Sequence, residues 1–229
     1  MPPRALDPAG VALVDKPAGP SSFAIVAQIR RVTGARTGHA GTLDPFATGL
    51  LLLLSGRSTK LTPRLVGLDK RYLTEVDLRS RTSTGDPEGD VVETLEPPEE
   101  HELERRLALL RGDIELPIPA ASAVKIGGER AYALARRGVE VEMPLRRSTV
   151  YELDAVGYTG ETVTLDLRVS SGTYVRAIAH ALGGHCATLR RTAVGPFDVA
   201  DAVTPDAFTP ERLLAEDVVL ARVAGEASA

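Results

Sequence analysis

The stretch Gly38-His39-Ala40-Gly41-Thr42-Leu43-Asp44-Pro45-Phe46-Ala47-Thr48-Gly49-Leu50-Leu51 carries the strongest information in this chain. It places one carboxylate, Asp44, in a glycine-rich segment directly before an apolar run. Pro45 disfavours a helical backbone at Asp44, and glycines permit the tight turns of a loop that approaches a ligand. Such a carboxylate is a candidate nucleophile or general base. Asp44-Pro45 could also simply open a turn or cap a short helix, so the stretch alone leaves the functional and the structural interpretation open.

Four further segments accompany this loop along the chain. They are Lys16-Pro17-Ala18-Gly19, Lys70-Arg71-Tyr72, Ser171-Gly172-Thr173-Tyr174-Val175-Arg176, and Leu189-Arg190-Arg191-Thr192 leading to Gly195-Pro196-Phe197. Together with the loop they resemble, in the same order, the motifs of the bacterial tRNA pseudouridine synthase B (TruB) family. The resemblance covers residues 10 to 200, and a chance match to five ordered motifs is improbable.

Hydrophobic patterning predicts interspersed strands and helices. We expect strands over residues 10–16, 50–54, 70–78, 146–158 and 162–169. Helices are expected from Ser21-Ser22 to Gly34, with Phe23, Val26 and Ile29 at helical spacing, and over 57–65, 99–110, 174–182 and 210–214. Residues 35–48 are expected to form a loop, residues 81–98 a loop or β-excursion, and residues 224–229 a frayed tail.

The recurring strand pairs predict an α+β (mixed α/β) fold with a mostly antiparallel sheet rather than a doubly wound one. The resemblance implies the pseudouridine synthase fold, a bent central sheet flanked by helices with the catalytic cleft across it. We expect a single catalytic domain over residues 1–229, with an acidic insertion at about 83–116. The tail of about 200–229 is too short for the C-terminal RNA-binding PUA domain that many family members carry.

Composition narrows the function classes. Cys186 is the only cysteine, which excludes an internal disulfide and a cysteine-based zinc cluster and fits a reducing cytosol. The apolar run Leu50–Leu54 is far too short to span a bilayer, and no signal peptide is visible. We therefore expect a cytoplasmic protein with no membrane association and no metal.

Charge is unevenly distributed along the chain. The net charge is −4 overall, but +6 over residues 1–82, −8 over 83–116, +3 over 117–195 and −5 over 196–229. The two positive blocks contain all five motifs, which favours a basic face for nucleic acid. Charge alone is equally compatible with a solvated surface that binds no partner.

The resemblance implies three catalytic residues. Asp44 corresponds to the family nucleophile, Arg176 to its permanently charged partner, and Tyr72 to the tyrosine that stacks on uracil and can accept a proton. Without the motifs, Arg176 would be read as a surface arginine at a helix start and Tyr72 as a tyrosine on the buried face of a strand. The isomerisation involves no redox change and loses no group, so no cofactor is expected.

The resemblance also implies substrate contacts. His39 is expected to fill the space left by a flipped base, Tyr174 to line the pocket, and Leu189 to pack against the base. Lys16 is expected to brace the catalytic loop or to touch phosphate, and Arg190 and Arg191 are candidates for phosphate contacts.

The expected activity is isomerisation of uridine 55 in the T loop of tRNA by a monomer that needs no guide RNA. An alternative is a tRNA-folding chaperone whose role is independent of catalysis. The guide-RNA-dependent relatives share these motifs but normally have extra terminal regions. Thr82, Thr84, Asp86 and Gly89 also fit the family's acidic loop. The chain departs from the family at Leu116, Ile118 and Ala121, where a glutamine, a proline and an aromatic residue are usual.

Overall fold

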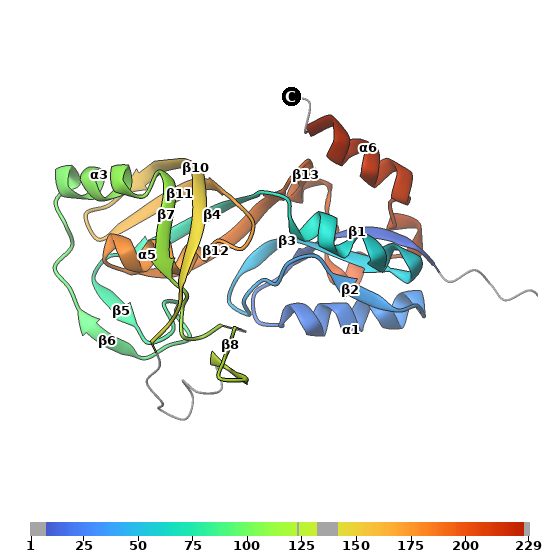
Figure 1. Cartoon of the computed structure of the whole chain (residues 1–229), viewed down its shortest axis with the longest axis horizontal. Helices are drawn as coiled ribbons and strands as arrows, with labels where there is room; N and C mark the ends of the chain where they lie inside the picture. Colours follow the sequence, from blue (N-terminus) through green and yellow to red (C-terminus); the bar gives the residue numbers. More distant parts are fainter. Residues whose placement is uncertain (1–7, 123, 132–141, 227–229) are drawn as a thin grey trace, which may run out of the picture. The chain divides into compact units, whose positions relative to one another are not determined.

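The computed structural model describes residues 8–122, 124–131 and 142–226. The chain divides into two compact units (Figure 1). Unit 1 comprises the residues up to Tyr72 together with those from Arg190 onward, and unit 2 comprises Leu73–Leu189. The chain passes between the units along β4 (Lys70–Asp77) and β12 (His185–Val194), each of which contributes residues to both. The expectation of one catalytic domain over 1–229 stays a prediction.

Unit 1 is built on strand β3 (Thr48–Ser55), which pairs from Gly49 to Ser55 with the whole of β1 (Gly10–Lys16) in antiparallel register. On its other side β3 pairs with the short strand β2 (Thr37–His39) and, in parallel, with β12 through Arg190 and Arg191. β13 (Phe197–Asp198) extends β12 as an antiparallel hairpin. The segment expected to be a loop therefore contains one strand, β2, within its first half.

Both faces of the β1–β3 pair are covered by apolar residues from helices. Leu51 and Leu53 pack with Ile25 and Ile29 of α1 (Ser22–Thr33). Leu50, Leu52 and Leu54 face the opposite way, against α2 (Thr62–Val66) and α6 (Glu216–Glu226). Figure 1 shows α1 and α6 on opposite sides of these strands. Because no face of β3 is left to solvent, its sequence is a continuous apolar run rather than an alternating one.

Helix α1 begins and ends where its sequence predicts. The Ser21 side chain accepts a hydrogen bond from the Ala24 amide at 3.2 Å, and Gly34 ends the helix in the left-handed conformation at φ 66°. Phe23 differs from the expectation, because it lies outside the buried stripe of α1 and is 73% exposed.

The C-terminal part of unit 1 departs from the sequence-based assignment. The helix expected at 210–214 is only a 3-10 turn, Pro210–Arg212, and residues 57–65 form a 3-10 turn (Gly56–Leu61) that continues into α2. The expected frayed tail is wrong up to Glu226, since residues 216–226 form α6. Val219 and Val223, one helical turn apart and both buried, anchor this helix.

Unit 2 contains the strands β12, β4, β11, β10 and β7 in this spatial order. β11 (Thr162–Val169) and β10 (Leu145–Tyr158) pair antiparallel, as do β10 and β7 (Gly112–Pro117). Every second residue of β11 is buried, as the alternating sequence predicts. The strands β7 and β12 were not expected. Two small hairpins, β5 (Ser80–Thr82) with β6 (Val91–Thr94) and β8 (Lys125–Ile126) with β9 (Glu129–Arg130), complete the strands.

Among the described residues of unit 2, the α-helices are α3 (Glu100–Leu109) and α5 (Val175–Leu182), close to their expected bounds. Leu103 and Leu107 of α3 are buried, and Arg106 donates a hydrogen bond to the carbonyl of Leu182 at the end of α5. The acidic stretch 83–116 is therefore folded, since it contains β6, α3 and most of β7. Within the described ranges, no helix combines the length and hydropathy needed to cross a membrane.

Candidate active site

The Asp44 loop is fixed from below by a buried lysine. The ammonium of Lys16 has no solvent exposure and donates to the carbonyl oxygens of Pro17, Pro45 and Ala47 at 2.9, 3.0 and 2.6 Å. Its position at the end of β1 directs it under the loop. Of the two roles expected for Lys16, the structure supports bracing of the loop, because a fully buried ammonium cannot reach a phosphate.

A serine fixes the other side of Asp44. The Ser22 hydroxyl accepts a hydrogen bond from the amide of Leu43 and donates one to its carbonyl, both at 2.8 Å. The Ala47 amide closes a turn onto the Asp44 carbonyl at 3.2 Å. Asp44 itself is half-buried. The residues on both sides of this carboxylate are therefore held in place by contacts from β1 and α1, which the sequence did not reveal.

Arg191 is a second buried cation under the same loop. It is 1% exposed, and its guanidinium donates to the carbonyls of Leu50 at 2.7 Å, Gly41 at 3.1 Å and Thr42 at 3.4 Å. A phosphate contact from Arg191 is thus not what the structure shows. The planar fork of an arginine suits this task, since its five N–H groups can reach carbonyls from several directions.

Arg190, the neighbour of Arg191 on β12, faces the other way. Its guanidinium is 39% exposed and forms two parallel bonds to the carboxylate of Asp15, at 3.0 and 2.8 Å. Adjacent residues of a strand point to opposite faces, which explains the different surroundings of these two arginines. Arg190 keeps the exposure that a phosphate contact requires.

His39 lies on β2 at the start of the loop and is half-buried. Burial and the nearby charge of Arg191 lower the pKa of His39, so its imidazole is neutral at neutral pH. Its Nδ1 atom is buried without a hydrogen-bond partner among the described residues. A neutral ring of this kind can stack on bases without adding charge.

Tyr72 and Lys70 lie on the buried face at the start of β4. Tyr72 is 7% exposed and Lys70 is 6% exposed. The Lys70 ammonium donates to the carbonyls of Val66 and Leu68, at the end of α2. Burial, reinforced by the charge of Arg191, lowers the pKa of Lys70 to about 8. Lys70 therefore fixes the connection between α2 and β4, and Tyr72 lies two residues further along β4.

In unit 2, Arg176 occupies the first turn of α5 and is 3% exposed. Its guanidinium donates to the carbonyls of Thr84 at 2.6 Å and Ala121 at 3.0 Å, and lies 3.3 Å from the carboxylate of Asp86. Asp86 is 4% exposed and also accepts bonds from the Thr84 hydroxyl and the Glu88 amide. The surface-arginine interpretation of Arg176 is therefore wrong, and Asp86 is a partner that the sequence analysis did not assign.

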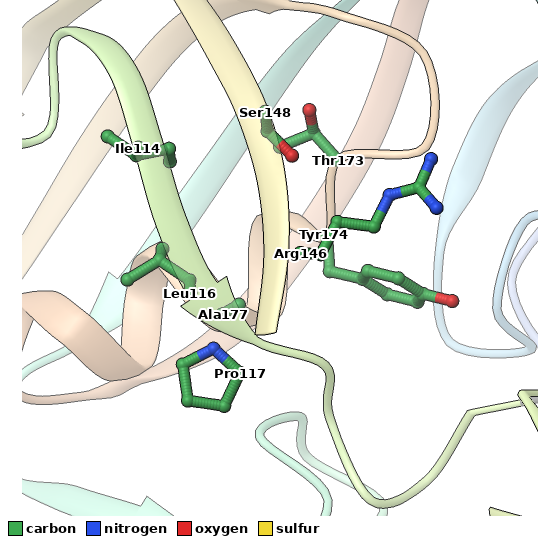
Figure 2. A pocket seen from close by; sticks show the side chains of 8 residues that line it. All are labelled: Ile114, Leu116, Pro117, Arg146, Ser148, Thr173, Tyr174 and Ala177. Carbon is green, nitrogen blue, oxygen red and sulfur yellow. The ribbon is translucent and has the colours of Figure 1, made fainter. Parts of the chain in front are cut away.

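Tyr174 lies two residues before Arg176 and lines a small, open pocket within unit 2. The pocket lies between β7, β10 and the start of α5, and Figure 2 shows the Tyr174 ring and the Arg146 side chain pointing to the same side. Leu116, where the family usually has glutamine, lines it with Tyr174. Leu189 is buried on β12, so its surroundings alone do not distinguish a base contact from ordinary packing.

The described residues contain no cluster of three or more His, Cys, Asp or Glu side chains that could bind a metal ion. Unit 1 contributes the carboxylate of Asp44 in its braced loop and the phenol of Tyr72, and unit 2 contributes the buried guanidinium of Arg176. The pairing of Asp44 with Arg176 joins residues of different units and stays a prediction.

The conserved pattern of the TruB family of pseudouridylate synthases (N-terminal domain) matches residues 30–175 of this chain. The chain belongs to the TruB family. A tRNA pseudouridine synthase B of Corynebacterium jeikeium (strain K411) is 43% identical over 217 residues, which cover 87% of this chain and 70% of the relative. The tRNA pseudouridine synthase B of Geobacillus thermodenitrificans (strain NG80-2) is 43% identical over 211 residues, covering 85% and 70%.

Solved structures of two other complexes contain a chain with the same fold. The chain superposes on a chain of a Cbf5-Nop10-Gar1 complex with a TM-score of 0.66 and 26% identity, covering 89% of this chain and 57% of that one. An archaeal box H/ACA sRNP Nop10-Cbf5 complex gives a TM-score of 0.65, with 24% identity and coverage of 97% and 60%. The chain thus spans less than two thirds of those chains. The predicted pseudouridine synthase fold, mixed α/β with a mostly antiparallel sheet, is confirmed.

Proposed function

We propose that this protein is a tRNA pseudouridine synthase that isomerises uridine 55 in the T loop of tRNA. Membership of the TruB family supports the reaction class. The observation that carries the proposal is the Asp44 loop, whose backbone is fixed on both sides of the carboxylate by Lys16, Ser22 and Arg191. A loop of this rigidity holds a reacting group in one geometry, which is where much of the rate acceleration of an enzyme comes from.

In this proposal Asp44 is the nucleophile that assists cleavage of the glycosidic bond. Its carboxylate attacks either C1′ of the ribose or C6 of the base. In either case the C1′–N1 bond breaks, the uracil rotates, C5 bonds to C1′ and the carboxylate is released. The C5 proton leaves to solvent and N1 takes one up, so the product is an isomer of the substrate and no oxidant is needed. Arg176 is its charge partner, and Asp86 and the Thr84 carbonyl fix the orientation of that guanidinium beforehand. An opposite charge favours the ionised form that a nucleophile needs.

Tyr72 stacks on the uracil ring and accepts a proton during the rearrangement. The target uridine must leave its stack to reach these groups, and His39, neutral because its pKa is lowered, takes its place in the loop. Tyr174 and Leu189 line the base pocket, and Arg190 contacts phosphate. Lys16 and Arg191 brace the loop and do not contact RNA.

The substrate of this proposal is the T stem-loop of tRNA, recognised by a monomer without guide RNA. We place the activity in the cytoplasm, where bacterial tRNA is used. The experiment incubates the protein with an unmodified tRNA transcript and maps pseudouridine by nuclease digestion and mass spectrometry. We expect one pseudouridine, at position 55, and none in a transcript in which uridine 55 is replaced by cytidine.

Two variants test the assignment of the nucleophile. Asp44→Asn should abolish the product, whereas Asp154→Asn, the same chemical change at an exposed position of β10, should not. Product at another position would refute the uridine 55 assignment. No product from any variant, combined with faster tRNA folding by both Asp44→Asn and the unaltered protein, would favour the chaperone alternative instead.

A further inference from the structure

Helix α1 presents an exposed face that the proposed chemistry does not use. We call it the α1 face, and it consists of Phe23, Ala24, Ala27, Arg30 and Arg31. The side chains of Phe23, Ala24, Arg30 and Arg31 are exposed, and Ala27 is half-buried between them. At 100° per residue these positions form one stripe along the helix, opposite the stripe that packs on β3.

Phe23 is the most exposed aromatic side chain of the described residues, at 73%. Single exposed apolar residues are common on protein surfaces, so the exposure of Phe23 alone does not indicate a binding role. Its position in the chain gives a reason to consider one. Ser22, the preceding residue, is bonded through its hydroxyl to both backbone groups of Leu43, which directly precedes Asp44. Phe23 therefore follows directly on the residue that ties α1 to the candidate catalytic loop.

The two arginines supply charge on the same stripe. Within the described residues, neither Arg30 nor Arg31 has an ion-pair partner, and α1 contains no carboxylate. Arg31 donates a hydrogen bond to the Ala27 carbonyl of its own helix. Basic residues at a helix C-terminus interact favourably with the helix dipole. This explains the presence of two arginines there, but it does not explain an aromatic ring on the same stripe, about 10 Å away.

We infer that the α1 face binds the RNA strand next to the target nucleotide, with a base stacked on Phe23 and phosphates bound by Arg30 and Arg31. An aromatic ring with unpaired arginines at its side is the combination that binds exposed bases and the phosphate backbone together. Ala24 and Ala27 leave the ring and both guanidinium groups open to a flat ligand. This inference rests on the proposed function, because it assigns a second contact region to the same RNA substrate.

The protein contains no tryptophan, so Phe23→Trp introduces a single fluorescent reporter at the centre of the inference. We expect unmodified tRNA to quench this tryptophan as the complex forms. Leu109→Trp is the control, because Leu109 is 81% exposed on α3, in unit 2 and outside the α1 face. Its emission should not change.

Two further variants measure the contribution to affinity, by filter retention of labelled tRNA. Phe23→Ala should weaken binding about tenfold, whereas Leu109→Ala should leave it within twofold. Replacing both Arg30 and Arg31 with glutamine should reduce the slope of log affinity against log salt by about 1.5. Phe23 and both arginines are exposed, so these variants are expected to fold, and thermal unfolding checks this.

Unchanged emission of Phe23→Trp in a complex that filter retention detects would overturn the inference, as would wild-type affinity of Phe23→Ala. Emission that depends on protein concentration without RNA would also overturn it, since the face would then bind a second copy of the chain. These outcomes are independent of the proposed function. If tRNA quenches the reporter but no pseudouridine forms, the α1 face is supported and the catalytic assignment fails.

Discussion

Replacing Arg191 with methionine tests whether the Asp44 loop depends on the cation beneath it. The substitution keeps an unbranched apolar stem and removes three hydrogen bonds, to Leu50, Gly41 and Thr42. Arg191 is 1% exposed, so water cannot easily replace the guanidinium. A hydrogen bond from a charged group contributes about 1.5–3 kcal/mol, and the 3.4 Å bond contributes least. We expect a loss of about 3–5 kcal/mol of unfolding free energy, a large part of the stability of a typical domain.

Urea unfolding measures that loss, and the neighbouring arginine provides the control. Arg190→Met removes the same side chain from a half-exposed ion pair with Asp15, and such pairs contribute at most about 1 kcal/mol. Turnover should separate the two variants as well. Displacement of the Asp44 loop should lower kcat about 100-fold for Arg191→Met, whereas Arg190→Met should raise KM in a salt-dependent way.

An NMR titration of His39 supplies a readout that general destabilisation does not mimic. The charge of Arg191 helps to lower the pKa of His39, so this pKa should rise in Arg191→Met and stay unchanged in Arg190→Met. The reasoning is refuted if Arg191→Met keeps wild-type kcat and an unshifted His39, or if both variants lose the same stability.

Three further predictions concern other parts of the scaffold. Gly49→Ala should lower the free energy of unfolding by more than about 3 kcal/mol, because the added Cβ would lie 2.2 Å from the Arg191 carbonyl oxygen and Gly49 has φ +103°. Gly160→Ala is the control. Gly160 has φ +90° but nothing within 4 Å of the added Cβ, so this change should cost only about 1 kcal/mol. Asp86→Asn should lower the free energy of unfolding by about 2–4 kcal/mol in urea titrations, because it leaves the buried guanidinium of Arg176 without its carboxylate partner. Unchanged stability would show that the Thr84 and Ala121 carbonyls are enough to stabilise the buried guanidinium. Burial lowers the pKa of Lys70 to about 8 in the folded protein, against 10.5 for an exposed lysine. The unfolded chain therefore binds more protons between these pH values, and the free energy of unfolding gains from this group as pH rises from 8 to 10.5. Lys70→Met should lack that gain when unfolding free energies are compared across this pH range, and an identical rise in both proteins would contradict the assignment.

Much of the fold could be predicted because its elements follow simple patterns. The run Leu50–Leu54 is apolar throughout because helices cover both faces of β3. The alternating sequence of β4 and the capping residues of α1 equally match their structures. In each case the local sequence and the packing favour the same element.

In the strands that were not expected, the local sequence and the packing do not favour the same element. β12 contains two adjacent arginines, and these were interpreted as surface residues that contact phosphate. In the structure Leu189 and Arg191 are both buried, with the more exposed Arg190 between them. Burial of every second residue, here Leu189 and Arg191, is typical of a strand. This pattern could be recognised in the sequence only by assuming that Arg191 is buried. Such burial becomes favourable only when carbonyl partners are present, and these come from a segment about 140 residues away.

The candidate site shows the same limit. The resemblance singled out Lys16 and Arg176, and both lie at buried positions with several hydrogen bonds, while their roles stay predictions. It did not predict Ser22 as the group that fixes Leu43, or Asp86 as the partner of Arg176. These contacts are long-range in sequence, so no local pattern reveals them.

The most direct test of the account is the single-turnover rate of tritium release from tRNA labelled at C5 of uridine, with Asp44→Asn at saturating concentration. Saturation removes any difference in RNA affinity, so the rate reports the chemistry at the carboxylate alone. The account predicts release by the unaltered protein and none above background by Asp44→Asn, although the variant still retains tRNA on a filter. Release at the wild-type rate by Asp44→Asn would contradict it.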